Sequence, residues 1–316
     1  MPPELSLTTT ATEALDLLYQ HRLLSTPQLG ELLAAPYTER SVIRVLDRLR
    51  RHELVACVQA RTGTGRMGHR LWFLTQLGAE VVEAVPDRAE SRRRLLTPAL
   101  AAGQLQAHTL AVNEVGLAFM RAARERGHDF GPYSWRHEVA HELDPRTAGG
   151  RGHVIADSVL RYWMPLPDGL IAVRYRFVEV DRANRLVDDV VGNLVRYARL
   201  REVWADRRAA GRDPRDDAPR WTMLYRYFPG VIVVLTNAGR SNLTRRLSNL
   251  LALCRAEPEL GSPDGVSVSF VFFDDLMTRG PFAPIFRRLE GERLVNWLGH
   301  EDSHVLAEGA SDESAG

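Results

Sequence analysis

The arrangement of apolar residues between positions 10 and 84 constrains the fold of this chain more than any other feature of the sequence. Apolar residues recur at helical spacing in two stretches, TEALDLLYQHRLL and TERSVIRVLDRLRRHELV. Between them lies STPQLGELLA, where Ser25 or Thr26 is the expected N-cap and Pro27 belongs to the first helical turn. Two strand-like runs joined by the glycine-rich turn TGTGRMG follow. Three helices and a β-hairpin in this order predict a winged helix-turn-helix domain over residues 8–85.

A second domain is predicted over residues 104–299, since 316 residues are enough for two separate cores. Its elements are a long amphipathic helix, three strand-like runs, and then helix, strand, helix and strand. The run GVIVVLTN is almost wholly apolar, which is typical of a strand buried on both faces. This order predicts a mixed α/β sheet. Residues 86–103 are expected to connect the domains, and the polar segment 300–316 is expected to be a disordered tail.

The composition excludes several classes of protein. The sequence has no run of the roughly 18 apolar residues that a membrane span needs, and its N-terminus lacks the features of a signal peptide. With only Cys57 and Cys254, it has neither a disulfide framework nor a cysteine-based zinc site. We therefore expect a cytoplasmic protein with no membrane partner. All 41 basic residues are arginine, so any mechanism that requires a lysine is excluded.

The predicted winged helix is strongly basic, although the whole chain has a formal net charge of only +1. Between residues 40 and 70, eight arginines stand against Asp47 and Glu53, which gives a local net charge of +6. Four of these arginines recur every three or four residues and line one face of the third helix. Such a face, beside a basic hairpin tip, suits a helix in the major groove of double-stranded DNA and a wing on its phosphates. The predicted DNA-binding residues are Arg40, Ser41, Arg44, Arg48, Arg51, Arg61, Arg66 and Arg70.

The motif HEVAH, from His137 to His141, fits the H-E-x-x-H pattern of zinc metalloproteases. On a helix the two histidines would lie one turn apart, with Glu138 as the general base. A proline and two glycines interrupt the segment almost at once, and no third ligand follows at a suitable spacing. As a strand, the segment would place both histidines on one face with Trp135, and Glu138 on the other. We therefore expect a strand rather than a zinc site.

The strand-like segment YRFVEVD carries Glu179 and Asp181 on alternate residues, so both carboxylates point to the same face. Two like charges side by side raise the free energy of the fold unless a metal ion or a basic partner offsets them. Mg²⁺ accepts oxygen ligands of this kind. The alternative is a pair of structural acids at a strand end, neutralised by Arg174, Arg176 or Arg196.

Several short motifs of the second domain resemble a known family. AHTLAVNEVGLAF, WRHE, IADSVL, FVEVDRA and GNLVRYARL follow the winged helix in the order found in the replication-relaxation family of plasmids and integrative elements. The resemblance covers roughly residues 10 to 280. The C-terminal half of that family is itself similar to the PD-(D/E)xK nuclease fold. The resemblance therefore implies a restriction-endonuclease-like α/β domain and a role in plasmid replication, DNA relaxation or transfer.

The resemblance also implies roles for individual residues. Asp157 matches the first acid of the nuclease motif and Glu179 matches the second. These two carboxylates would hold Mg²⁺, which is the one cofactor expected, and the metal would activate a water molecule. Glu114 on the first helix and Glu138 on a strand are further candidates for catalysis. His108 matches a position of the family pattern without an implied role.

The chain departs from that pattern where the nucleases of this fold carry lysine. Asp181 stands at the lysine position, which changes the charge of the site by two units. Asn193, ahead of Tyr197, stands where the family often carries a lysine on the following helix. Positive charge would have to come from arginines, which stay protonated and present a planar fork instead of a single ammonium. The nearby arginines are Arg182, Arg196 and Arg199.

The expected function is that of a double-stranded DNA-binding protein of a mobile element, acting in replication, relaxation or transfer with a nuclease-like domain that lacks its lysine. One alternative is a Mg²⁺-dependent endonuclease or nickase that uses Asp157, Glu179 and Asp181. A second is a transcriptional regulator whose second domain dimerises or senses a ligand. A third is a winged helix that binds protein or merely presents a solvated basic face. Other replication or transfer proteins are expected partners, and a homodimer is left open.

Overall fold

The computed structural model describes residues 7–60, 68–85, 96–101, 103, 105–143, 152–202, 220–261 and 265–301. The chain divides into two compact units, residues 1–117 with 131–133 and residues 118–130 with 134–316. The division falls inside the helix α6 (Leu105–Arg126). Most of the expected connector lies outside the described residues, apart from a segment that contains the short helix α5 (Pro98–Ala101). The expected tail is described only as far as residue 301.

The N-terminal unit has the winged-helix order of elements. Its three-stranded antiparallel sheet has the order β1-β3-β2. Strands β2 and β3 form the predicted hairpin, with Val55 paired to Leu74 and Gln59 paired to Arg70. The winged helix-turn-helix predicted for this part of the chain is therefore confirmed. The elements are α1 (Thr9–His21), β1 (Leu24–Ser25), α2 (Thr26–Leu32), α3 (Glu39–Arg51), β2 (Val55–Gln59), β3 (Arg70–Leu74) and α4 (Gln76–Glu83).

Capping side chains fix the starts of α2 and α3. Ser25 Oγ accepts a hydrogen bond from Gln28 N at 3.3 Å, and Gln28 Oε1 accepts one from Ser25 N at 3.1 Å. This reciprocal pair is a capping box, and it makes Ser25 the N-cap. At the start of α3, Thr38 Oγ1 accepts from Ser41 N at 3.3 Å. The buried apolar residues of α3 then turn its basic face away from the core.

The C-terminal unit is built on a seven-stranded sheet with the order β10-β9-β8-β7-β6-β5-β4. The neighbours β6, β7 and β8 are parallel, and the other pairs are antiparallel. This sheet confirms the predicted mixed α/β class. After α6 the elements are β4 (Trp135–Glu142), β5 (His153–Pro165), β6 (Ile171–Asp181), α7 (Val187–Glu202), the 3-10 helix η4 (Arg220–Met223), β7 (Gly230–Leu235), α8 (Arg240–Ala256), β8 (Val268–Phe272), α9 (Phe273–Arg279), β9 (Phe286–Arg288) and β10 (Leu294–Val295).

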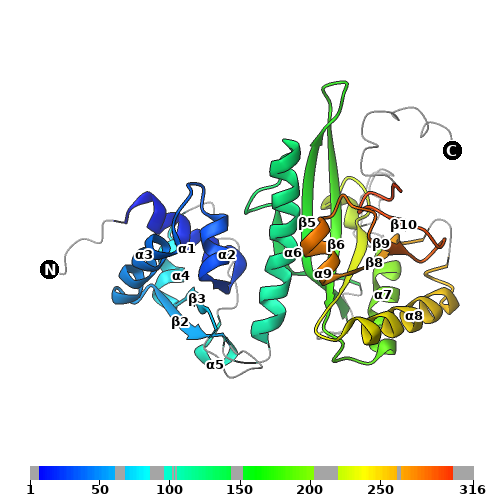
Figure 1. Cartoon of the computed structure of the whole chain (residues 1–316), viewed down its shortest axis with the longest axis horizontal. Coiled ribbons are helices and arrows are strands. Elements are labelled where there is room, and N and C mark those ends of the chain that lie inside the picture. Colours follow the sequence, from blue (N-terminus) through cyan, green and yellow to red (C-terminus); the bar gives the residue numbers. More distant parts are fainter. Residues whose placement is uncertain are drawn as a thin grey trace, which may run out of the picture. The chain divides into compact units, whose positions relative to one another are not determined.

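Helices lie on both sides of β5 and β6 (Figure 1). On one side, α7 and α8 enclose a core in which Phe177 of β6 stacks on Tyr197 of α7, with 4.9 Å between the ring centroids. On the other side, the C-terminal part of α6 contributes Phe119, whose ring lies 6.3 Å from that of Tyr162 of β5. Since side chains alternate along a strand, the two predicted acids of β6 share the face of Phe177. They therefore point toward α7 and α8.

The helix α6 is long, with 22 residues, but it is not a membrane span. Its last two turns carry several charged side chains, Arg121, Arg124, Glu125 and Arg126. No helix in the described ranges combines the length and the apolar character that crossing a bilayer requires.

Candidate functional site

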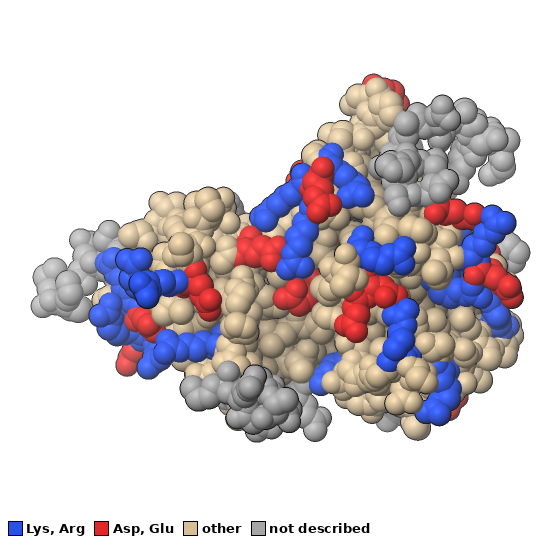
Figure 2. All heavy atoms as spheres, in the orientation of Figure 1, with Lys and Arg blue, Asp and Glu red and all other residues tan. Residues whose placement is uncertain are grey.

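The helix predicted to contact DNA presents its basic face to solvent. Because the apolar residues of α3 pack inward, the arginines that recur every three or four residues form one outward row. Figure 2 shows arginines gathered over this part of the N-terminal unit. The exposed arginines of the row are Arg40, Arg44, Arg48 and Arg51.

Neighbouring side chains restrain this face. Ser41 Oγ donates a hydrogen bond to Thr38 O at 2.7 Å, so this hydroxyl belongs to the cap of α3. Arg70 of β3 forms an ion pair with Asp47 of α3, with 3.4 Å between Nη1 and Oδ1. The pair is half exposed and adds little stability, but it links the base of the wing to α3. Two predicted DNA contacts lie outside the described residues, Arg61 and Arg66.

The HEVAH segment belongs to the strand β4 and not to a helix. His141 is buried, and its Nε2 lies 2.7 Å from the hydroxyl oxygen of Tyr225. Burial lowers the pKa of His141, although two hydrogen bonds to the backbone oppose the shift. Among the residues that the structure describes, no three His, Cys, Asp or Glu side chains form a group that could hold a metal ion. Because the segment is a strand, His137 and His141 do not lie one helical turn apart, as the zinc protease motif requires.

On strands β4 and β5, side chains alternate between the two faces of the sheet, and this alternation is interrupted at one point. On β5, Val154, Ala156 and Val159 all belong to the core that α7 covers, so the alternation shifts by one residue between the last two. On β4, Trp135 stacks on Phe130 on the α6 side, whereas His141 lies against Phe177 on the α7 side. The expectation that Trp135 and His141 share one face was therefore wrong. A strict period of two cannot foresee such a shift.

Glu138 of β4 lies at the point of this shift and has a left-handed backbone, with φ at 49°. The pairing of β4 with β5 passes from His137 and Ser158 to Val139 and Ala156, which leaves Glu138 opposite Asp157. A residue with a side chain raises the energy of the fold by about 1–3 kcal/mol in this conformation. Such residues gather at functional sites, where the surrounding structure holds them in place.

Asp157 joins β5 to β6 through its side chain. The backbone pairing of these strands ends at Ser158 and Val178. Immediately beyond that pair, Asp157 Oδ2 accepts a hydrogen bond from Val180 N at 2.8 Å. The carboxylate thus replaces a backbone acceptor where the two strands separate. This bond holds Asp157 next to Glu179, the second predicted acid.

Glu179 of β6 is buried next to Asp157, with only 3% of its surface exposed. The Tyr197 hydroxyl donates to Glu179 Oε1 at 2.5 Å, and Arg185 Nη2 lies 4.0 Å from Oε2. Burial raises the pKa of Glu179 to about 8, and the charge of Asp157 adds to the shift. Hydrogen bonds from Tyr197 and Asn193 and the charge of Arg185 oppose it. At neutral pH the Glu179 carboxyl therefore holds its proton.

Asp181, at the end of β6, is completely buried and forms an ion pair with Arg246 of α8. Arg246 Nε donates to Oδ2, and Arg246 Nη2 donates to Oδ1 at 3.0 Å, so the contact is bidentate. Oδ1 also accepts from Ala183 N at 3.2 Å, and Arg246 Nη2 donates to Arg185 O at 2.9 Å. These bonds fix the loop between β6 and α7. They thereby place Arg185 beside Glu179.

The arginines that neutralise the two acids of β6 are not those expected from the sequence. Arg246 pairs with Asp181 and Arg185 lies beside Glu179. Arg176 instead donates to Trp297 O at 3.2 Å, and Arg196 donates to His153 O. The strand acids and Arg246 are more than 60 positions apart, so sequence spacing does not reveal that α8 brings them together.

Sequence reasoning also missed the partners of Glu179 on α7. The signal that could have found them is the family position at which a lysine is often present. In this chain that position is Asn193, whose side chain hydrogen-bonds to Glu179, and the Tyr197 hydroxyl follows one turn later. The same position on α7 therefore faces the second acid, with an amide in place of an ammonium group.

The candidate from the long helix has a different environment. Glu114 of α6 belongs to the N-terminal unit, where its Oε1 accepts a hydrogen bond from Gln28 Nε2 at 2.9 Å. Gln28 Nε2 also donates to Leu110 O at 3.1 Å. His108 lies on the same part of α6. Glu114 thus takes part in the packing of α2 of the winged helix.

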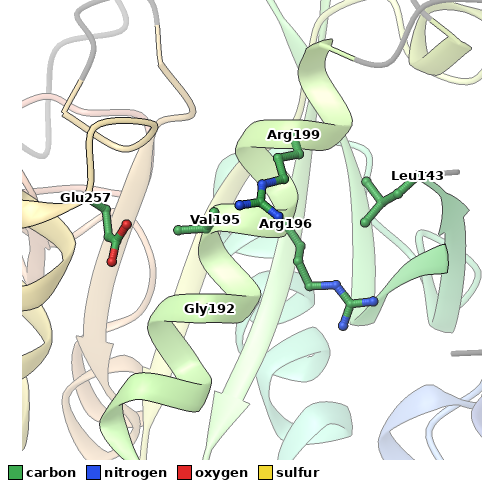
Figure 3. Close-up of a pocket in the computed structure, with 6 residues that line it drawn as sticks. All are labelled: Leu143, Gly192, Val195, Arg196, Arg199 and Glu257. Atoms are coloured by element: carbon green, nitrogen blue, oxygen red, sulfur yellow. The ribbon is translucent and has the colours of Figure 1, made fainter. Parts of the chain in front are cut away.

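An open hollow of about 440 Å³ lies beside α7 (Figure 3). Two arginines of α7 line it, and both are engaged with neighbouring groups. Arg196 Nη2 donates to His153 O, and Arg199 Nη2 lies 3.5 Å from Glu259 Oε1. The hollow does not coincide with the three predicted acids. Its lining residues are Leu143, Gly192, Val195, Arg196, Arg199 and Glu257.

Replacing Arg246 by alanine is expected to lower the free energy of unfolding by about 3–5 kcal/mol, because Asp181 would be left as a buried charge without its partner. The matched control is Arg245→Ala, which removes an exposed arginine from the same helix. That control should change stability by no more than about 0.5 kcal/mol. Urea denaturation at neutral pH measures both variants. Equal effects would show that the ion pair stabilises the fold no more than a solvated arginine does.

Replacing Glu179 by glutamine is expected to change how stability depends on pH. Since the pKa of Glu179 is about 8 in the folded chain and about 4.3 in the unfolded chain, the wild type loses stability as pH rises between these values. The glutamine variant has no proton to lose, so its stability relative to the wild type should increase across this range, by about 5 kcal/mol at most. Thermal denaturation in buffer with a chelator measures the difference. Parallel curves for the two proteins would contradict the raised pKa.

Comparison with known proteins places the chain in a family. Two mutants of ZitR from Lactococcus lactis are similar in structure, at 22% and 21% identity. The first match covers 40% of this chain and 78% of that chain with a TM-score of 0.23, and the second covers 39% and 76% with a TM-score of 0.22. Because these TM-scores are low, neither match supports a conclusion about the fold or the function of this chain. A search of the curated proteins gave no match. The family model described as replication-relaxation matches residues 15–215, which is well over half of the sequence, and the chain therefore belongs to the replication-relaxation family.

Proposed function

We propose that this chain binds double-stranded DNA through α3 of its winged helix and acts in the replication, relaxation or transfer of a mobile element. The observation that carries the proposal is the row of four exposed arginines on α3. Membership of the replication-relaxation family supports a DNA-binding role connected with replication. The local net charge of +6 between residues 40 and 70 supplies the attraction for a phosphate backbone.

The chemistry of α3 suits the major groove of a duplex. In helix-turn-helix proteins the second helix of the motif enters the groove, where arginine can form two hydrogen bonds with guanine or pair with phosphates. Here the capping box of α2 and the Thr38 cap fix the two helices at their starts. The ion pair between Arg70 and Asp47 ties β3 to α3, so the wing and the helix would meet the DNA together.

We further propose that the nuclease-like site in the C-terminal unit is degenerate. The chain has no lysine to assist a water molecule, and Asp181, at the lysine position, is neutralised by Arg246. The proton that Glu179 holds at neutral pH is a further disadvantage for a metal-binding carboxylate. These features support a domain that keeps the frame of a nuclease and lacks its cutting groups.

The double variant Arg44→Ala/Arg48→Ala is expected to bind duplex DNA more weakly and with a smaller salt dependence. Each phosphate contact contributes about 0.9 to the slope of log affinity against log salt, so the slope should fall by about 2. Fluorescence anisotropy with a labelled duplex over a salt series measures the slope. The control is Arg245→Ala/Arg279→Ala, which removes two exposed arginines from the C-terminal unit. Unchanged binding by the α3 variant would show that this helix is not the docking face.

A second candidate function is metal-dependent cleavage of DNA. It is favoured by the closeness of Asp157 and Glu179, since Mg²⁺ is often held by two carboxylates together with water and phosphate oxygens. In that case Asp157 and Glu179 would hold the metal, which would supply an activated water molecule. Asp181 would not be a ligand, because both of its oxygens accept hydrogen bonds from Arg246.

Supercoiled plasmid incubated with the purified chain and Mg²⁺, Mn²⁺ or chelator tests this second candidate. The suitable variants are Asp157→Asn and Glu179→Gln, because each keeps an oxygen to accept the bond that the acid accepts now. We expect no nicking or linearisation by the wild type. Metal-dependent cleavage that both variants lose would establish a lysine-free nuclease and contradict the degenerate site.

A further inference from the structure

The hairpin of β5 and β6 extends beyond the sheet of the C-terminal unit. β4 pairs with β5 only as far as Leu160, and β7 pairs with β6 only from Arg176 onward. Residues 161–175 therefore form a two-stranded ribbon, which is the projecting green hairpin in Figure 1. At its base, Trp163 exchanges two backbone hydrogen bonds with Asp129, of 3.1 and 3.2 Å. The ribbon is thus anchored at one end and free of the sheet at the other.

The two faces of this ribbon have different surroundings. Tyr162 and Met164 point to one face and are buried, and the ring of Tyr162 packs near that of Phe119 of α6. The opposite face, here called the ribbon face, carries three cross-strand pairs. Its side chains are exposed or only partly buried. The pairs are Arg161 with Tyr175, Trp163 with Val173, and Pro165 with Ile171.

The ribbon face combines aromatic rings with arginines. The guanidinium carbon of Arg161 lies 5.2 Å from the centroid of the Trp163 ring. Arg136 of β4 is exposed and is paired with Val159, so it shares this side of the sheet with Arg161. Within the ribbon the only acid is Asp168, which lies in the turn, where its Oδ1 accepts from Leu170 N at 3.0 Å. Asp129 is exposed and is paired with Trp163, so it lies on this side as well. Two arginines against one aspartate leave the ribbon face with a net positive charge.

We propose that the ribbon face binds single-stranded DNA. Unpaired bases stack on aromatic side chains while arginines meet the phosphates, and both kinds of group occur together here. A duplex keeps the faces of its bases stacked inside and shows only their edges, so an aromatic strip has nothing to stack on. The partly exposed Trp163 would take a base, with Arg161 and Arg136 beside the backbone. This activity goes beyond the duplex binding proposed for α3 and does not depend on it.

The test measures the affinity of the full chain for a dye-labelled thymidine oligonucleotide and for a duplex of equal length. Trp163→Ala should weaken binding of the single strand about 5- to 150-fold, which is the loss of one stacked base at about 1–3 kcal/mol. Trp163→Phe keeps a ring and should retain most of the affinity. Arg161→Ala should lower the slope of log affinity against log salt by about 0.7 for the single strand.

Two controls make the result specific. Arg245→Ala removes an exposed arginine elsewhere in the same unit and should leave binding of the single strand unchanged. Arg44→Ala/Arg48→Ala should weaken duplex binding and keep single-strand binding, which separates a failure at α3 from a failure at the ribbon. Melting curves check that each variant is folded. The proposal is overturned if folded Trp163→Ala and Arg161→Ala bind the single strand as the wild type does. It is also overturned if they weaken duplex and single-strand binding in equal proportion.

Discussion

The ion pair between Asp181 and Arg246 determines the geometry at the carboxyl end of β6. Removing two charges from water raises the free energy by several kcal/mol for each ion, and only close, well-directed hydrogen bonds offset that penalty. Here the contact is bidentate, and the same two side chains also bond to the loop that leads into α7. Since α7 carries the Tyr197 hydroxyl that meets Glu179, the arrangement of the acidic pair depends on this ion pair.

A chain without lysine has to build its charged sites differently. A lysine in an active site can lose its proton and orient a water molecule, whereas arginine stays charged and works best as a fixed, planar partner for a carboxylate. The C-terminal unit uses arginine in that second way: Arg246 closes on Asp181, and Arg185 is held beside Glu179. On α3 the same residue type forms an exposed row instead. One residue type therefore serves both as an internal partner for acids and as an external contact for phosphates.

The features that were predictable from the sequence are those that depend on neighbours along the chain. Ser25 or Thr26, followed by Pro27, indicated the start of α2, and the structure shows that Ser25 is the N-cap. The alternate positions of Glu179 and Asp181 put both acids on one face. The pairing of Asp181 with Arg246 was not predictable, because it joins elements that are far apart in sequence. The left-handed backbone at Glu138 was not predictable either, since a regular strand pattern continues through it.

The small elements after β8 were not predictable from the sequence either. α9, β9 and β10 are short, and β9 and β10 complete the edge of the sheet by pairing with strands already formed. Such edge strands carry too few residues for a periodic signal. β9 forms because it pairs with β8, and β10 forms because it pairs with β9. The ribbon face was missed for a related reason, because its two strands were recognised separately and their register was not.

The proton on Glu179 has a consequence for any cation that reaches the two acids. A divalent ion and a proton would compete for the same carboxyl oxygens, so binding of the ion would release a proton and strengthen as the solution becomes more alkaline. Acid would then weaken binding of the ion at the two acids. Because Glu179 is buried, the amount of cation bound at Asp157 and Glu179 would depend on the pH of the solution.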